Sequence, residues 1–200
     1  MEFQRIIMPQ VQKRLESIPV VALVGSRQVG KTTLAKQLLS QSGRATIYLD
    51  LESPEDLNKL SMPERYLDDR SDMLVIIDEV QRMQELFPVL RAVIDKKRSN
   101  GRFLLLGSAS PELLTGSSES LAGRISYFEV NPLLYGEVKP LYTFEQLWLR
   151  GGYPEMLMAK DDETSFRNRL DMIATYIERE LPVLGLSVSG NVLRNLLKMV

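Results

Sequence analysis

Short apolar runs alternate along this chain with longer segments in which apolar residues recur at helical spacing. Continuous apolar runs are typical of strands that are buried on both faces of a sheet. Because helix-like segments separate the runs, the pattern predicts βαβ units and an α/β fold with a mainly parallel, five-stranded sheet flanked by helices. The predicted strands are Val20–Val24, Ala45–Leu49, Met73–Ile77, Phe103–Leu106 and Ile125–Val130.

The segments between these runs carry helix signals. A helix start is predicted at Ser53-Pro54-Glu55-Asp56, where a small polar residue precedes a proline and two acidic residues. Apolar residues at helical spacing follow the first and third strands, at Leu34, Leu38 and Leu39 and at Leu86, Leu90, Val93 and Ile94.

Beyond Gly151-Gly152-Tyr153-Pro154 the pattern is wholly helical. We therefore predict two parts, a domain over residues 1–150 and a helical extension over residues 151–200. Leu193, Leu196, Leu197 and Val200 share one face of a predicted helix, and the sequence stops there without a cap or a polar tail. Either the protein closes on this helix or a further domain is cut short, and we favour the second interpretation.

Composition narrows the chemistry. The chain has 44% hydrophobic and 26% charged residues, as soluble globular proteins do. No apolar stretch approaches the roughly 18 residues that a membrane span needs, and the first residues are too polar for a secretory signal. We expect a cytoplasmic protein without a membrane partner. The absence of Cys and His excludes disulfides, thiolate nucleophiles, Ser-His-Asp triads and zinc sites built from these residues.

The net charge of −1 provides no bulk basic field for nucleic acid. The candidate basic patch is local, at Lys96-Lys97-Arg98 with Arg102, and a solvated helix end followed by a loop is the alternative interpretation. Chemistry in this chain therefore falls to carboxylates, Lys, Arg, hydroxyls, backbone amides and an oxygen-ligated cation such as Mg²⁺.

Residues 25–32 match the pattern G-x-x-x-x-G-K-[ST] and connect an apolar strand to a helix. Glycines allow the backbone to wrap around a phosphate with its amides pointing inward, and the start of the helix adds its own amides and dipole. Lys31 is expected to bind the β- and γ-phosphates, and the Thr32 hydroxyl to bind Mg²⁺. We predict a site for ATP or a close analogue, formed by Gly25, Ser26, Arg27, Gln28, Val29, Gly30, Lys31, Thr32 and Thr33.

Asp78 and Glu79 follow the most hydrophobic predicted strand, at the sheet edge where open α/β folds bind ligands. Asp78 is a candidate Mg²⁺ ligand, directly or through water, and Glu79 is a candidate general base for an attacking water. A surface acidic pair that caps the next helix is the alternative interpretation.

The position of this acidic pair bears on the class of nucleotide enzyme. A further strand, around Tyr48, lies between the phosphate loop and Asp78 in sequence. This arrangement is typical of the P-loop division in which a strand-borne glutamate activates water. A GTPase is excluded, because the nearest string to N-K-x-D, Asn58-Lys59-Leu60-Ser61, lacks the aspartate.

Two further polar residues are candidates for the reaction. Ser108 follows the fourth strand and could place a hydroxyl beside the γ-phosphate, with Ser110 as a substitute, although small polar residues after strands are also common turn formers. Arg124 precedes the fifth strand and could stabilise the γ-phosphate of a neighbouring subunit in a homo-oligomer. An arginine held in its loop by an ion pair is the alternative.

These segments appear in the order found in a known family. They resemble the AAA-like P-loop ATPases of bacteria and archaea that carry a C-terminal domain of unknown function. The resemblance rests on Gly-Ser-Arg-Gln-Val-Gly-Lys-Thr-Thr (25–33), Ile-Ile-Asp-Glu-Val-Gln (76–81), Leu-Leu-Gly-Ser-Ala-Ser (105–110), Ser-Leu-Ala-Gly-Arg (120–124), Arg-Gly-Gly-Tyr-Pro-Glu (150–155) and Tyr-Ile-Glu-Arg-Glu-Leu (176–181).

The resemblance implies an AAA-like nucleotide-binding core and a helical lid or linker that leads into a winged-helix-like domain, which would be missing after Val200. Many AAA proteins have Asn where this chain has Ser108. By matched position the resemblance implies Walker A residues at Lys31 and Thr32, Walker B residues at Asp78 and Glu79, a sensor-like place for Ser108 and an arginine-finger place for Arg124.

Three functions remain open from the sequence. We expect Mg²⁺-dependent ATP hydrolysis, with the nucleotide state changing the angle at residues 151–154. The alternative is an ATP-gated switch with little turnover that controls a DNA- or protein-binding C-terminal domain. A phosphotransferase acting on a small molecule is the third hypothesis. A nucleic-acid partner depends on the missing domain, because the net charge does not support one.

Overall fold

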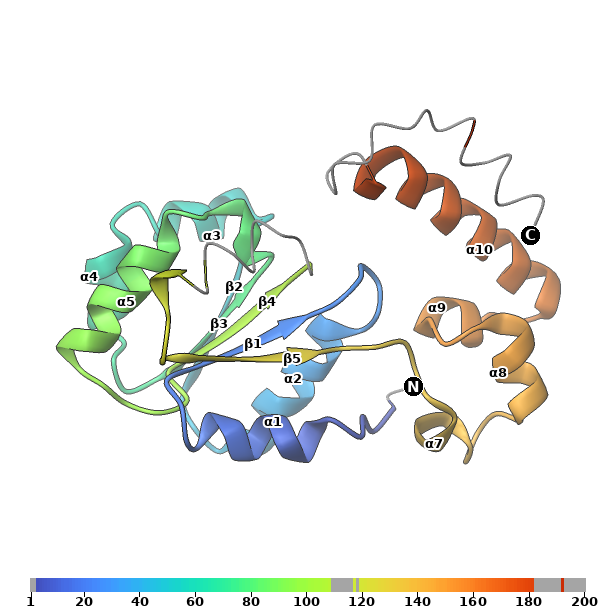
Figure 1. The fold of residues 1–200 in the computed structure, drawn as a ribbon, viewed down its shortest axis with the longest axis horizontal. Helices are drawn as coiled ribbons and strands as arrows, with labels where there is room; N and C mark the ends of the chain where they lie inside the picture. The colour runs from blue at the N-terminus through green and yellow to red at the C-terminus, as the bar shows by residue number, and fades with distance from the viewer. Residues whose placement is uncertain (1–2, 109–116, 118, 182–191, 193–200) are drawn as a thin grey trace. The chain divides into compact units, whose positions relative to one another are not determined.

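The computed structural model describes residues 3–108, 117, 119–181 and 192. The chain divides into two compact units, Met1–Asn131 and Pro132–Val200 (Figure 1). The boundary predicted at residue 150 falls within the second unit. Ser110 and the apolar face predicted near the C-terminus lie outside the described residues.

A five-stranded sheet forms the first unit, with the strand order β2-β3-β4-β1-β5 and every pairing parallel (Figure 1). All five predicted strands are confirmed to within one residue at each end. Since β4 lies between β1 and β3, the carboxyl ends of these three strands are neighbours at one edge of the sheet. The strands are β1 (Val20–Val24), β2 (Thr46–Asp50), β3 (Leu74–Asp78), β4 (Phe103–Gly107) and β5 (Ile125–Glu129).

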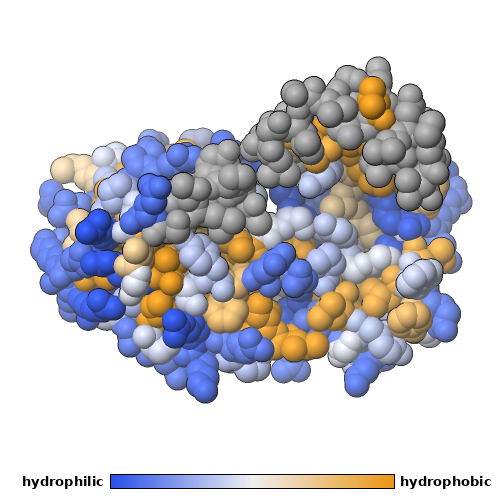
Figure 2. Space-filling model, viewed as in Figure 1, coloured by the Kyte–Doolittle hydropathy of each residue, from blue (hydrophilic) through white to orange (hydrophobic). Residues whose placement is uncertain are grey.

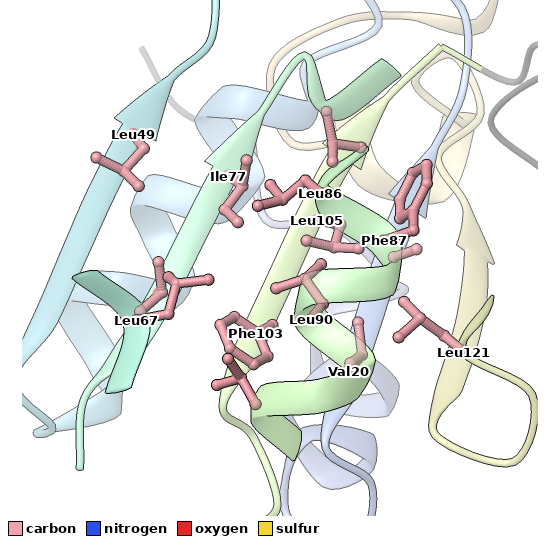
Figure 3. Close-up of a cluster of buried hydrophobic side chains, with 14 of the residues drawn as sticks. Val20, Leu49, Leu67, Ile77, Leu86, Phe87, Leu90, Phe103, Leu105 and Leu121 are labelled. Atoms are coloured by element: carbon pink, nitrogen blue, oxygen red, sulfur yellow. The ribbon is translucent and has the colours of Figure 1, made fainter. Parts of the chain in front are cut away.

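Helices cover both faces of this sheet, which explains why β1, β3 and β4 are buried along their whole length. On one face α5 (Leu86–Lys96) packs its predicted apolar residues against alternate strand positions such as Phe103 and Leu105 (Figure 3). On the opposite face α1 (Met8–Leu15) contacts β1, and α2 (Lys31–Ser42) contacts β4.

The polar stretch after β2 forms two short helices, α3 (Pro54–Lys59) and α4 (Pro63–Asp68). The predicted helix start is confirmed, because Ser53 is the N-cap of α3 and Pro54 its first residue. A second proline, Pro63, begins α4. Proline is favoured at the first helical position because its missing N–H needs no partner there.

Arg102 ties the ends of two helices to the sheet. Its side chain is 1% exposed, and its guanidinium donates to the carbonyl oxygens of Val93 at 2.7 Å, Lys97 at 3.1 Å and Leu67 at 3.2 Å. Arg102 is therefore part of the interior and cannot belong to the basic patch that the sequence suggested. The two lysines of that patch are paired with acidic residues.

Helices are the only regular secondary structure among the described residues of the second unit. α8 begins with a capping box between Thr143 and Gln146, and Asp161 is the N-cap of α10, where its carboxylate accepts the N–H of Thr164 at 2.7 Å. The helices are α7 (Tyr135–Val138), α8 (Phe144–Arg150), α9 (Pro154–Leu157) and α10 (Asp162–Thr175), and a π-helical turn follows at Tyr176–Glu180.

The segment in which the sequence suggested a hinge is packed within this second unit. Gly151 ends α8, and the carbonyl oxygen of Gly152 accepts the N–H of Leu133 at 2.7 Å. A Cβ on Gly152 would lie 2.5 Å from the Leu133 carbonyl oxygen. The division between the compact units instead falls between Asn131 and Pro132.

The surface mixes polar and apolar residues (Figure 2). Most of the exposed large apolar side chains among the described residues belong to the second unit, and Trp148 is 81% exposed there. No helix within the described ranges is both long enough and apolar enough to cross a bilayer.

Candidate functional site

The predicted phosphate loop leaves the carboxyl end of β1 and enters α2, as the sequence indicates. Gly30 is the N-cap of α2 and has a left-handed backbone, with φ of 99°. Gln28 is also left-handed, with φ of 61°, which is uncommon for a residue with a side chain. Val29 is fully buried, so only its backbone can face a ligand, while Arg27, Gln28 and Thr33 are exposed.

Lys31 holds this loop from inside. Its side chain is buried, and its ammonium donates to the carbonyl oxygens of Gly25 and Ser26, both at 2.9 Å. The positive charge therefore lies within the curve of the loop, near the start of α2, where backbone amides point along the helix axis. Both features favour an anion at this position.

Arg5 holds the same loop from outside. Its guanidinium is buried and donates to the carbonyl oxygen of Val29 at 3.1 Å and to that of Asn131. Val29 belongs to the loop, and Asn131 follows the end of β5. One side chain from the amino-terminal segment thus fixes the loop to the exit of the edge strand.

The carboxylate of Asp78 joins β3 to the loop. Its Oδ2 accepts hydrogen bonds from the Thr32 hydroxyl at 2.6 Å and from the Tyr48 hydroxyl at 2.5 Å. Its Oδ1 accepts the N–H of Glu79 at 2.9 Å. Burial and the bond to Asp78 raise the pKa of Tyr48, so the phenol is protonated at neutral pH and donates. The structure therefore brings together the two residues predicted to hold Mg²⁺.

Glu79 has an unusual backbone and a fixed side chain. Its φ of 54° and ψ of 41° are left-handed, a conformation that costs on the order of 1 kcal/mol or more outside glycine. Its Oε2 accepts a hydrogen bond from Nε2 of Gln81. Only the amide nitrogen can face a carboxylate, so the Gln81 Oε1 points away, and it is buried with no hydrogen-bond partner in the described part of the chain. Gln81 therefore orients the Glu79 carboxylate.

Ser108 comes directly after β4 and is half-buried. Because β4 lies between β1 and β3, Ser108 follows the strand between the one that leads into the loop and the one that ends at Asp78. The sensor-like role that the resemblance implies for Ser108 stays a prediction.

Arg124 lies at the opposite end of the strands from the phosphate loop, beside the amino end of β1. Its carbonyl oxygen accepts the N–H of Val20 at 3.0 Å, at the amino end of β1, whereas the loop follows the carboxyl end of the same strand. At about 3.3 Å per residue, the strand's five residues keep Arg124 away from its own loop. Its guanidinium makes a two-point ion pair with Asp95, at 2.7 and 2.9 Å. Its predicted action on a neighbouring subunit stays a prediction.

Sequence reasoning missed the contacts that three residues make at this site, Tyr48, Gln81 and Arg5. Gln81 was inside a segment that carries the family resemblance, and its separation of two residues from Glu79 was the available signal. Tyr48 and Arg5 belong to no motif. Their partners are 30 residues away for Tyr48 and 24 and 126 residues away for Arg5.

A family model described as an AAA domain matches residues 17–139, and one described as a domain of unknown function matches residues 141–200. Proteins described as uncharacterized, from Mycobacterium bovis and Mycobacterium tuberculosis, are each 40% identical over 185 residues, which is 92% of this chain and 41% of the relative. The chain thus spans about two fifths of the length of these curated relatives.

Two solved structures share the fold. A Walker-type ATPase of Pyrococcus abyssi has a TM-score of 0.64 at 19% identity, over 92% of this chain and 75% of that one. A signal transduction ATPase with a tetratricopeptide repeat sensor, from Pyrococcus horikoshii, has a TM-score of 0.54 at 13% identity, over 88% of this chain and 35% of that one. With the family match over most of the first unit, these findings show that the chain belongs to the AAA domain family of P-loop ATPases.

Proposed function

We propose that this chain binds ATP together with Mg²⁺ and hydrolyses it. The observation that carries the proposal is the contact between the Thr32 hydroxyl and the Asp78 carboxylate, 2.6 Å apart, beside a loop whose interior holds the ammonium of Lys31. Membership of the AAA domain family supports it.

The donor atoms suit Mg²⁺, which prefers hard oxygen ligands. Thr32 and Asp78 supply a hydroxyl and a carboxylate oxygen at one point. The described residues contain no cluster of three or more acidic side chains that could hold a metal, and Mg²⁺ in nucleotide sites is usually held by one or two carboxylates together with substrate phosphates. When bound, the metal would neutralise charge that develops on those phosphates.

The chain's own groups divide the remaining work. Lys31 would replace its hydrogen bonds to the loop carbonyls with bonds to phosphate oxygens. Its ammonium already lies inside the loop, so this exchange needs only a small movement of the side chain. Glu79 would accept a proton from the attacking water as a carboxylate base. Gln81 would keep that carboxylate in one orientation, because its amide already donates to it.

Replacing Glu79 by glutamine tests the assignment of the base. ATP affinity should stay within about twofold of wild type, because the residue shape is kept, while turnover should fall by about 10² to 10⁴. Equilibrium binding and phosphate release would be measured on the same preparations. Glu85→Gln is the matched control, since Glu85 is exposed at the start of α5. Hydrolysis that survives in the Glu79 variant would show that another group is the base.

The products of the reaction separate hydrolysis from group transfer. Hydrolysis yields ADP and free phosphate in equal amounts. A phosphorylated small molecule formed in place of phosphate would instead identify a phosphotransferase and overturn the proposed reaction.

The second candidate is an ATP-gated switch with little turnover, and the ion pair between Arg124 and Asp95 favours it. An arginine held at two points within its own chain must leave that pair before it can stabilise a phosphate elsewhere. A switch predicts slow basal turnover that rises when a DNA or protein partner is added to the full-length protein. Fast turnover without any partner would count against it.

A homo-oligomer that acts through Arg124 predicts a further result. Arg124→Ala should slow turnover without weakening ATP binding, and mixing it with a Lys31-defective subunit should restore some activity, since each supplies what the other lacks. No restoration on mixing argues against action between subunits. The cytoplasmic location and a nucleic-acid partner remain predictions from the sequence.

A further inference from the structure

The Asp78 carboxylate accepts three hydrogen bonds, which fix its orientation. Oδ1 takes the N–H of Glu79 at 2.9 Å, while Oδ2 takes the hydroxyls of Thr32 at 2.6 Å and Tyr48 at 2.5 Å. Both hydroxyls must donate, because an ionised carboxylate can only accept. Charge-assisted bonds of this kind are among the stronger hydrogen bonds in proteins.

The two hydroxyl donors differ in what they can do once a cation is present. Thr32 is itself a proposed ligand, so the oxygen that now donates to Asp78 has to turn a lone pair toward the metal. Tyr48 lies on β2 and is not part of the phosphate loop. Tyr48 is not itself a proposed ligand, so its hydroxyl can keep donating to Oδ2 both with and without the metal.

Tyr48 is placed for this task by two elements. In the parallel register of β2 and β3, Tyr48 lies opposite Ile76, and Asp50 lies opposite Asp78. Residues two apart in a strand share a face, so the Tyr48 ring and the Asp78 carboxylate lie on the same side of the sheet. From α2, the ammonium of Lys36 lies 5.7 Å from the centre of the Tyr48 ring, within the range of a cation–π interaction.

We propose that Tyr48 is a positioning residue for the Mg²⁺ site, whose hydroxyl holds the Asp78 carboxylate in its metal-binding orientation and so sets the metal affinity. The inference rests on the proposed function, because the metal enters with it. Groups that orient metal ligands commonly change metal affinity or activity by about 10- to 100-fold when they are removed.

Replacing Tyr48 by phenylalanine in the full chain removes the hydroxyl and keeps the ring. ADP affinity in EDTA should stay within about twofold of wild type, because Lys31 and the loop amides are unchanged. The Mg²⁺ concentration that half-saturates the increase in ADP affinity should rise about 10-fold. Binding of Mn²⁺ in the presence of ADP, followed by electron paramagnetic resonance, should weaken by a similar factor.

Turnover gives a second readout that separates positioning from structural damage. With saturating Mg²⁺, the kcat of Tyr48→Phe should return close to the wild-type value, because the lost orientation is compensated by metal concentration. A variant that is merely destabilised would lose kcat and metal-free ADP binding together.

Tyr127→Phe is the matched control. Tyr127 is a partly buried tyrosine on β5, the other edge strand, and its hydroxyl is 2.7 Å from that of Ser117. Tyr127→Phe should lose a hydrogen bond between two neutral hydroxyls and leave the Mg²⁺ half-saturation unchanged. Should Tyr48→Phe fail to fold, Lys36→Met is the second variant, because it keeps the Tyr48 hydroxyl and removes only the cation over the ring. The Mg²⁺ concentration at half-saturation is then expected to rise about twofold.

Three outcomes decide the matter. A Mg²⁺ half-saturation that rises in Tyr48→Phe alone supports the role of the hydroxyl. A value equal to or below that of wild type overturns it, even if hydrolysis proceeds normally. If the ADP affinity of the wild-type chain does not depend on Mg²⁺, the proposed function is overturned, and the role of Tyr48 with it.

Discussion

Replacing Gly25 by alanine would place a methyl group against the backbone at the exit of β5. The new Cβ would lie 2.5 Å from the carbonyl oxygen of Val130, and contacts shorter than 3.0 Å are essentially never made by a Cβ. The two must therefore separate by about half an ångström. Val130 cannot move easily, because its N–H donates to the carbonyl oxygen of Val24 at 2.7 Å. The phosphate loop is the part that has to shift.

Overpacking of this kind costs about 1 to 3 kcal/mol. In a chain of this size each kcal/mol lowers the unfolding temperature by about 2 to 4 °C, so Gly25→Ala should unfold several degrees below wild type. A displaced loop also misplaces its amides, and errors approaching 1 Å can cost about 100-fold in a tightly fitted site. We expect ATP affinity to fall at least 10-fold, measured by calorimetry alongside thermal unfolding.

Gly152→Ala provides a control with the same steric problem in the second unit. Its Cβ would also lie 2.5 Å from a carbonyl oxygen, that of Leu133, so a comparable loss of stability is expected with ATP affinity within about twofold of wild type. If Gly25→Ala binds ATP and unfolds as wild type does, the contact with Val130 does not limit the loop. If both variants lose ATP binding equally, the effect reflects general destabilisation.

Two substitutions and one pH titration test other parts of the structure. Arg102→Met should lower the free energy of unfolding in urea titrations by about 3 to 5 kcal/mol, because three backbone carbonyls lose a charged donor. The control, Lys97→Met, breaks an exposed ion pair and should cost less than about 1 kcal/mol. Equal losses of stability in the two variants would refute the argument. Gln81→Ala should lower kcat about 10-fold with little change in KM, because Glu79 loses its orienting donor, and an unchanged kcat would show that this bond does not matter for turnover. Hydrogen bonding to the start of α10 lowers the pKa of Asp161. Its contribution to stability is therefore present above an unfolded pKa of about 4 and is lost as the pH falls through the folded value. NMR titration of the first turn of α10 should report a pKa for Asp161 below the unfolded value, and an Asp161 pKa equal to the unfolded value would contradict the capping role.

Local patterns were sufficient to predict the sheet and the position of the phosphate loop. The strands that end at Val24 and Asp78 are buried on both faces, and such strands are recognisable as unbroken apolar runs. The phosphate loop was predictable because its glycines and Lys31 occupy fixed positions in a short segment. Both signals are contained within a few consecutive residues.

Contacts between distant segments could not be predicted in this way. The bond from Tyr48 to Asp78 depends on how β2 pairs with β3 and on where α2 lies. The burial of Arg102 was missed for a similar reason, since a basic residue near two lysines reads as surface until α4 and α5 present their carbonyl ends to it. Polar side chains gain their roles here from the packing of whole elements.

The bonds made by Arg5 have a practical consequence for the design of shorter fragments. The AAA domain match begins at residue 17, and every predicted site residue lies after it. A fragment cut at that point would keep every motif and still remove the guanidinium that holds the carbonyl oxygens of Val29 and Asn131. Fragments for expression and assay should therefore begin before Arg5. The hydrogen bonds from Arg5 to the phosphate loop lie outside the region that sequence matching marks as the domain.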